Sequence, residues 1–296
     1  MKRTVRPLFL LPLLSFVALA LALLGPLSAS AATASGSQPH VMRTKQHTAP
    51  LRRGNNLTYH GGPVMAGTAN AYAIFWEPTG SYVSPTYNSL ITRYFGDIGG
   101  SSLYHNDTQY KQSNGGFASN AMFAGSWVDT AAYPSGTLQD SNIQSEVSHA
   151  QQVNGWKTSL NNLFFVFTAK NENICVSGVC SFSYFCAYHS NFGNTLYAAM
   201  PYTGTNLAAC GVTHSPNGDV DADSTINVTS HEQNEAATDP QGTAWYDSSG
   251  NEIGDKCAWN FGSLNSQGGD VSWNGHAYYV QKEWDNHVSA CVLSGP

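Results

Sequence analysis

Charged residues are scarce in this sequence of 296 residues, and they are unevenly distributed along it. Asp, Glu, Lys and Arg together make up 11% of the chain. The first 54 residues contain seven of the 13 Lys and Arg residues and none of the 19 Asp and Glu residues. The rest of the chain therefore has six basic and 19 acidic residues, a formal net charge of −13. Because an acidic body repels polyanions, we expect no nucleic-acid partner.

Long apolar runs are also missing, except for one at residues 8–24. Three basic residues precede this run, Gly25-Pro26 ends it, and Ala29-Ser30-Ala31 then provides the small residues at which signal peptidase cleaves. A retained membrane anchor is the alternative, since the run comes close to the length that spans a bilayer. The helix-breaking Gly-Pro and the cleavage site favour a signal peptide at 1–31. We expect a secreted, extracellular monomer that does not contact the membrane after cleavage.

Apolar periodicity is absent from residues 32–54, which contain mainly Ser, Thr, Gln, Pro and basic residues. This composition is typical of a disordered linker or a short propeptide. Arg52-Arg53 is a candidate processing site within it. Residues 55–296 contain no internal repeat and are numerous enough to bury the core of a single domain.

All six cysteines lie in this domain. An even number of cysteines in an exported chain predicts disulfides, although six cysteines allow fifteen connectivities. Proximity along the chain favours the pairs Cys175–Cys180, Cys186–Cys210 and Cys257–Cys291. A thiolate metal site is the alternative, and an oxidising compartment argues against it.

The apolar pattern predicts an α+β domain. Two amphipathic helices are expected at 85–98 and 140–153. Strands are expected at 71–76, 163–168 and 196–202, and Pro201 places the last of them at a sheet edge or at a strand end.

The most informative stretch is 219–240, where we expect a helix with Asp223 or Ser224 as N-cap and with its end at Asp239-Pro240. His231 and Glu235 are four residues apart, so they point the same way from a helix. An imidazole and a carboxylate so placed can bind one zinc ion. Glu232, the next residue to His231, can activate a metal-bound water. This is the zincin pattern with its second His replaced by Glu, and it predicts a zincin-like core in which a mixed sheet covers a metal-site helix.

Two parts of this zinc site stay open at the level of sequence. The third ligand is Asp239, Glu252 or Asp255, and Tyr246 is a candidate for stabilising an oxyanion. A pattern of two acids and one His is also common on a solvated helix face, which is the alternative. The low overall charge makes such a concentration of ionisable residues informative.

Asp219, Asp221 and Asp223 have the spacing that opens a calcium loop, which makes Ca²⁺ a second candidate cofactor. Ser224 and Ser230 stand where an EF-hand loop has Gly and Glu, so that template fails, and an acidic helix cap is the alternative. The chain has no Gly-x-Ser-x-Gly elbow of a serine hydrolase.

Two further motifs carry a family resemblance. Residues 57–64 (LTYHGGPV) precede the strand predicted at 71–76, and residues 215–220 (SPNGDV) lead into the helix that ends with 237–240 (ATDP). Together they resemble the phosphate-induced/EXORDIUM-like secreted proteins, and the resemblance covers about residues 56–295. It implies an extracellular or cell-wall location and a link to growth, without an established catalytic activity. The plant members lack the His231-Glu232 pair and have Asn-Pro at Asp239-Pro240, so we assign this sequence to a bacterial-type branch with a zincin-like helix.

The sequence therefore predicts a secreted zinc-dependent hydrolase, a metallopeptidase with a peptide or protein substrate. Glu232 would take a proton from the water, and the zinc ion would polarise the carbonyl under attack. The alternative is a non-catalytic extracellular or cell-wall-associated EXORDIUM-like protein, whose partner is a cell-wall component. A carbohydrate-active enzyme is a third hypothesis, which needs two carboxylates facing each other across a groove.

Overall fold

The computed structural model describes residues 1–2, 39–48 and 55–296. The predicted signal peptide and most of the predicted linker lie outside the described residues. The chain divides into two units, Met1–Thr33 and Ala34–Pro296, and all the helices and strands of the described residues belong to the second. Within the described ranges, no helix has both the length and the apolar character needed to cross a membrane.

A six-stranded mixed sheet forms the centre of the second unit, in the order β1-β9-β10-β6-β3-β4. In this order the strands are His40–Arg43, Phe185–Phe192, Thr195–Met200, Asn162–Thr168, Gly67–Trp76 and Ala118–Asp129. Neighbours among β10, β6, β3 and β4 pair in parallel, whereas β9 and then β1 are added antiparallel at one edge.

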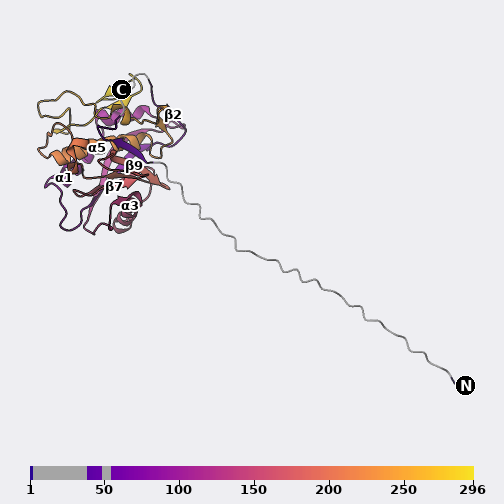
Figure 1. Cartoon of the computed structure of the whole chain (residues 1–296). Coiled ribbons are helices and arrows are strands. Elements are labelled where there is room, and N and C mark those ends of the chain that lie inside the picture. Colours follow the sequence, from indigo (N-terminus) through magenta and orange to yellow (C-terminus); the bar gives the residue numbers. More distant parts are fainter. Residues whose placement is uncertain (3–38, 49–54) are drawn as a thin grey trace. The chain divides into compact units, whose positions relative to one another are not determined.

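Helices cover both faces of this sheet. The α-helices are α1 (Tyr87–Asp97), α2 (Ser102–His105), α3 (Asp140–Asn154), α4 (Leu207–Cys210) and α5 (Val220–Thr238), and the 3₁₀ helices are η1 (Asn106–Gln109), η2 (Thr203–Thr205) and η3 (Asp255–Cys257). Side chains of α1 and α5 share one apolar cluster, and those of α3 belong to another. Accordingly, α3 lies on the opposite side of the strands from α1 and α5 (Figure 1).

Strand β6 shows why parallel strands of the central sheet contain continuous apolar runs. Phe165 and Phe167 pack into the cluster that contains α1 and α5, while Phe164 and Val166 pack into the cluster that contains α3. Every residue of β6 is buried. A parallel strand covered on both faces needs apolar side chains at consecutive positions, not at alternate ones.

Short strands form small sheets around the central one. They are β2 (Thr58–Tyr59) with β11 (Trp245–Tyr246), β5 (Leu138–Gln139) with β7 (Ile174–Val176) and β8 (Val179–Cys180), β12 (Val271–Trp273) with β13 (His276–Tyr278), and β14 (Glu283–Asp285) with β15 (Ala290–Val292).

Most of the predicted elements agree with the structure. Strands β3 and β6 contain the stretches predicted at 71–76 and 163–168, and helices α1 and α3 match the two predicted amphipathic helices. Strand β10 ends at Met200, immediately before Pro201, and pairs on both sides. The strand-end interpretation of Pro201 is therefore correct, and the edge interpretation is wrong.

Helix α5 differs from its prediction at its start and in its environment. Its N-cap is Asp219, whose side chain accepts a hydrogen bond from the Ala222 amide, and not Asp223 or Ser224. All of its residues from Ala222 to Thr238 are buried. The solvated helix face that we considered as the alternative is therefore wrong, because the sheet and the segments that follow α5 enclose its polar side chains.

Strand β1 lies where the sequence predicts a disordered linker or propeptide. His40 and Val41 pair with His189 and Tyr188 of β9, and the Met42 side chain is 0% exposed within the main apolar cluster. A run of four residues with two apolar side chains carries little periodic signal. Its order comes from pairing with a strand that is distant in sequence. Residues 32–38 and 49–54 lie outside the described residues.

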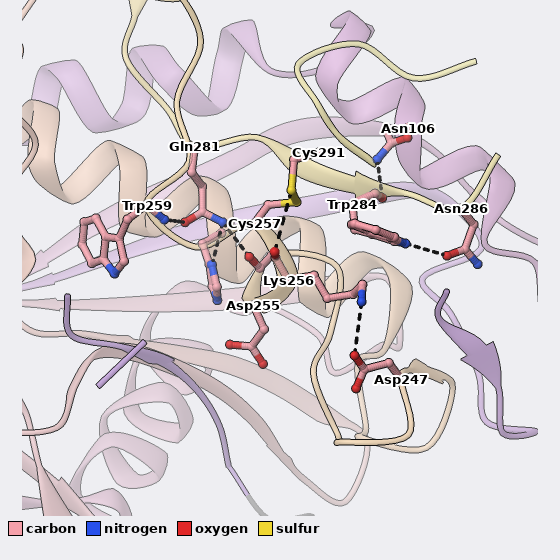
Figure 2. Close-up of a disulfide and its surroundings, with 12 residues drawn as sticks. Asn106, Asp247, Asp255, Lys256, Cys257, Trp259, Gln281, Trp284, Asn286 and Cys291 are labelled. Carbon is pink, nitrogen blue, oxygen red and sulfur yellow. Dashed lines mark hydrogen bonds and ion pairs between the residues drawn. A yellow bond between two sulfur atoms is a disulfide. The ribbon is translucent and has the colours of Figure 1, made fainter. Parts of the chain in front are cut away.

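The three disulfides confirm the predicted pairing. Cys175–Cys180, Cys186–Cys210 and Cys257–Cys291 are all formed, and the described residues include no free cysteine. Cys257–Cys291 joins η3 to β15, next to Asp255 and Gln281 (Figure 2).

The burial of Met42 predicts that β1 contributes to stability. Met42→Ala should lower the free energy of unfolding by about 2–5 kcal/mol, because it leaves a cavity in the core. Denaturant unfolding of the full chain measures this change. The matched control is Val153→Ala, at a side chain that is 54% exposed, which should change stability by no more than about 0.5 kcal/mol. Equal effects of the two substitutions would show that β1 is not packed against the core in solution.

Candidate metal centre

Ionisable side chains from four parts of the chain meet between α5 and the β1–β9 edge of the sheet. His231, Glu232 and Glu235 come from α5, His189 from β9 and His40 from β1; Glu252 comes from the loop before η3 and Asp255 from the start of η3. His231, Glu232, Glu235 and Glu252 are 0% exposed.

The first set of candidate ligands is His231, Glu235 and Asp255. Each offers one ligand atom, and these atoms lie within 4.8 Å of one another. One turn of α5 separates His231 from Glu235, which brings His231 Nε2 to 3.0 Å from Glu235 Oε1. The start of η3 adds Asp255, whose backbone amide donates to the same Oε1 over 2.9 Å. One imidazole and two carboxylates are a donor set that suits zinc.

Gln281 and Gly254 fix the orientation of His231. Gln281 Nε2 lies 3.0 Å from His231 Nδ1 and donates to the Gly254 carbonyl over 3.0 Å, and Figure 2 shows Gln281 beside the Cys257–Cys291 disulfide. A Cβ added at Gly254 would lie 2.6 Å from His231 Nδ1 and 3.0 Å from Glu235 Oε1. Because the φ angle of Gly254 is −77°, it is this close approach, and not backbone conformation, that calls for glycine.

The second set of candidate ligands is His189, Glu235 and Glu252, which also lie within 4.8 Å of one another through one ligand atom each. His189 Nδ1 is 3.7 Å from Glu235 Oε2, and His189 Nε2 is 3.8 Å from Glu252 Oε1. His40 Nδ1 lies 2.9 Å from Glu252 Oε2, and its ring stacks on His189 with the centroids 5.4 Å apart. Glu232 Oε2 contacts His189 Nδ1 at 3.1 Å.

Many polar atoms of this centre are buried without a hydrogen bond to any residue that the structure describes. They are Glu232 Oε1, Glu235 Oε2, Asp239 Oδ2 and Glu252 Oε1, whereas His231 Nε2 and Glu252 Oε2 make ion-pair contacts alone, with Glu235 Oε1 at 3.0 Å and His40 Nδ1 at 2.9 Å. A buried polar group that lacks a partner costs roughly 1–3 kcal/mol. A cation bound among these atoms would satisfy several of them at once, so the residues present fit a metal ion.

The pKa values show how few positive charges the centre contains. Burial, together with the nearby Glu235, raises the pKa of Asp255 to about 7. Burial and the surrounding carboxylates raise the pKa of Glu252 well above its usual range. Burial alone would lower the pKa of His231, but the carboxylates of Glu235, Glu232 and Asp255 together outweigh burial and raise that pKa to about 10. The carboxylates therefore compete for a small number of positive partners, which a divalent cation would supplement.

The predicted site residues separate into three groups. The structure brings His231, Glu232 and Glu235 together with both Glu252 and Asp255. Asp239 does not join either set of ligands, because it ends α5 and its Oδ1 accepts from the Thr243 and Ala244 amides. Tyr246 lies in β11, where its ring stacks on His60 with the centroids 3.6 Å apart, and no contact places it at the metal centre.

The carboxylates proposed for calcium bind separate partners. Asp219 accepts from the hydroxyls of Ser84 and Thr86, and Asp221 accepts from Tyr202. Asp223 accepts from the side chains of Ser215 and Asn217. Asp219 is the N-cap of α5, as the helix-cap alternative expects. The contacts of the three carboxylates give no support to a calcium loop here.

Two residues of the centre lie outside the set of ligands that the sequence predicted. His189 lies in β9, whose residues are buried up to Asn191. Its signal in the sequence was an ionisable residue directly after the apolar and aromatic run 185–188. His40 carried no such signal, because the residues around it gave no reason to expect a strand.

Comparison with known proteins supports the family resemblance. The chain is 25% identical over 286 residues to the protein EXORDIUM-like 5 of Arabidopsis thaliana, with 81% of this chain and 78% of the relative covered. It is 26% identical over 281 residues to EXORDIUM-like 3 of the same plant, with 80% and 82% covered. No protein-family model matches the chain, and no solved structure matches it. These similarities concern the family and say nothing of metal binding or catalysis.

The close approach at Gly254 generates a test of this geometry. Gly254→Ala should lower the free energy of unfolding by about 1–3 kcal/mol, because the added methyl group displaces His231 or Glu235 in a packed interior. The matched control is Gly96→Ala in α1, where an added Cβ meets nothing within 4 Å, and which should be neutral or slightly stabilising. Denaturant unfolding of both variants measures the difference. If Gly254→Ala left the free energy of unfolding unchanged, the loop before η3 would not be packed against α5.

Proposed function

We propose that this chain is a secreted EXORDIUM-like protein in which α5 and the start of η3 bind a zinc ion as a stabilising centre. His231, Glu235 and Asp255 would hold the ion. The observation that carries the proposal is the convergence of these three ligand atoms within 4.8 Å, in a centre where Glu232 Oε1 and Glu235 Oε2 are buried without a hydrogen bond to a described residue. Three disulfides and the predicted signal peptide support an extracellular location.

Burial favours the non-catalytic alternative over the hydrolase that the sequence predicts. Catalytic zinc keeps one coordination position open to water and substrate, whereas structural zinc is enclosed by protein. His231, Glu232 and Glu235 are 0% exposed, and β1 pairs along the edge of β9 beside them. With β1 in place a peptide has no access to Glu232. A closed site of this kind contributes to folding, because the unfolded chain cannot hold the ion in the same way.

The second candidate function is the zinc-dependent hydrolase with a zincin-like core, and one observation favours it. Glu232 directly follows the ligand His231, and its Oε1 is buried without a hydrogen-bond partner, as expected of a general base that accepts a proton from water. In that interpretation bound zinc would lower the pKa of a water molecule and polarise the substrate carbonyl. Glu232 would accept the proton, and His189, at 3.1 Å from Glu232 Oε2, would orient it. Tyr246 has no role in this arrangement.

The two candidates make different predictions for Glu232 and His231. Under the proposed function, wild-type protein binds zinc and cleaves no peptide. His231→Ala should reduce the zinc bound per chain and the thermal stability, because it removes a ligand. Glu232→Gln should keep the zinc, since Glu232 is not in the first set of ligands. Zinc content by elemental analysis, thermal unfolding with and without a chelator, and cleavage of a peptide library measure these outcomes.

His214→Ala is the matched control, because His214 is exposed and packs against Tyr279 away from the centre. It should leave zinc content and unfolding unchanged. Peptide cleavage by the wild type that is lost in Glu232→Gln, with zinc retained, would favour the hydrolase over the proposed stabilising role. Wild-type protein that binds no zinc would overturn both.

A further inference from the structure

The first set of ligands leaves His189, Glu252 and His40 without a role, although they lie in the same centre. These three residues come from β9, from the loop before η3 and from β1. His189 and Glu252 are 1% and 0% exposed, and Glu252 Oε1 lacks a hydrogen-bond partner among the described residues, whereas Oε2 lies 2.9 Å from His40 Nδ1. A second explanation is needed for this half of the centre, because a buried carboxylate oxygen without a hydrogen-bond partner is unfavourable.

Glu235 connects the two halves through its two oxygens. Oε1 faces His231 Nε2 at 3.0 Å and accepts from the Asp255 amide. Oε2 faces His189 Nδ1 at 3.7 Å and forms no hydrogen bond. A carboxylate whose oxygens point toward different histidines has the arrangement of a bridging ligand, in which each oxygen binds its own cation.

From this geometry we infer that the centre binds two divalent cations, with Glu235 as the bridge between them. The first cation lies among His231, Glu235 and Asp255, as in the proposed function on which this inference rests. The second lies among His189, Glu235 and Glu252, whose ligand atoms are within 4.8 Å of one another. Imidazole and carboxylate donors in this proportion suit zinc at both positions.

His40 lies beside the second position without belonging to its set of ligands. Its Nδ1 lies 2.9 Å from Glu252 Oε2, and its ring stacks on His189. His40 and His189 are directly paired residues of β1 and β9, so their side chains leave the sheet on the same face. The second cation therefore binds β9 directly, and its ligand Glu252 contacts His40 of β1.

Zinc stoichiometry of the full-length secreted chain tests the inference. After equilibration with zinc and removal of the free ion, elemental analysis should give two zinc ions per wild-type chain. His189→Ala should give one, because it removes a ligand of the second position alone. His231→Ala should also give one, through loss of the first position. Glu235→Gln should bring the number close to zero, which only a bridging ligand explains.

His214→Ala is again the control and should keep two ions. Where His189→Ala fails to fold, as circular dichroism reports, Glu252→Gln replaces it, since it keeps the size of the side chain and should also give one ion. One zinc ion in the wild type, unchanged by His189→Ala or Glu252→Gln, would overturn the second position and leave the proposed function intact. No zinc in the wild type would overturn both.

Discussion

The constraint on which the rest of the structure depends is that α5 carries ionisable side chains into the interior. His231, Glu232 and Glu235 are fully buried between the sheet and the segments that follow the helix. A buried charge without a partner costs several kcal/mol, so each carboxylate needs a positive or donating group nearby. His189 from β9, His40 from β1 and the amide of Asp255 are placed where they meet this need. The convergence of these distant segments on α5 follows from that requirement.

The segments that close over α5 are themselves held in place. Cys257–Cys291 fixes η3 against β15, and Gln281 contacts both His231 and the Gly254 carbonyl (Figure 2). Gly254 then passes so close to His231 that no side chain fits there. The disulfide therefore does more than stabilise the end of the chain, because it fixes the loop that brings Glu252 and Asp255 to the centre.

Local sequence patterns predicted the structural features that depend on residues close together in the sequence. The i, i+4 spacing placed His231 and Glu235 on one side of a helix, the apolar run of β6 identified a buried strand, and short separations gave the disulfides. What could not be predicted depends on distant segments. The polar residues of α5 left a solvated helix face open as the alternative to the metal-site helix, and only the tertiary fold shows that they are buried. His40 joins the centre only through the pairing of β1 with β9, for which four residues give no signal.

Strand β1 also decides what the centre can do. The ligands of a structural zinc ion and of a catalytic one can be the same residues, and access to the ion distinguishes the two. Here access depends on the outermost strand of the sheet, which pairs on one side only and is four residues long. The edge that β1 covers is the kind of edge to which extended peptides bind by adding a strand. Under the proposed function, a chain with the same ligands but without β1 would leave the edge of β9 that carries His189 open, so closure by β1 would separate a stabilising centre from a peptide-binding one.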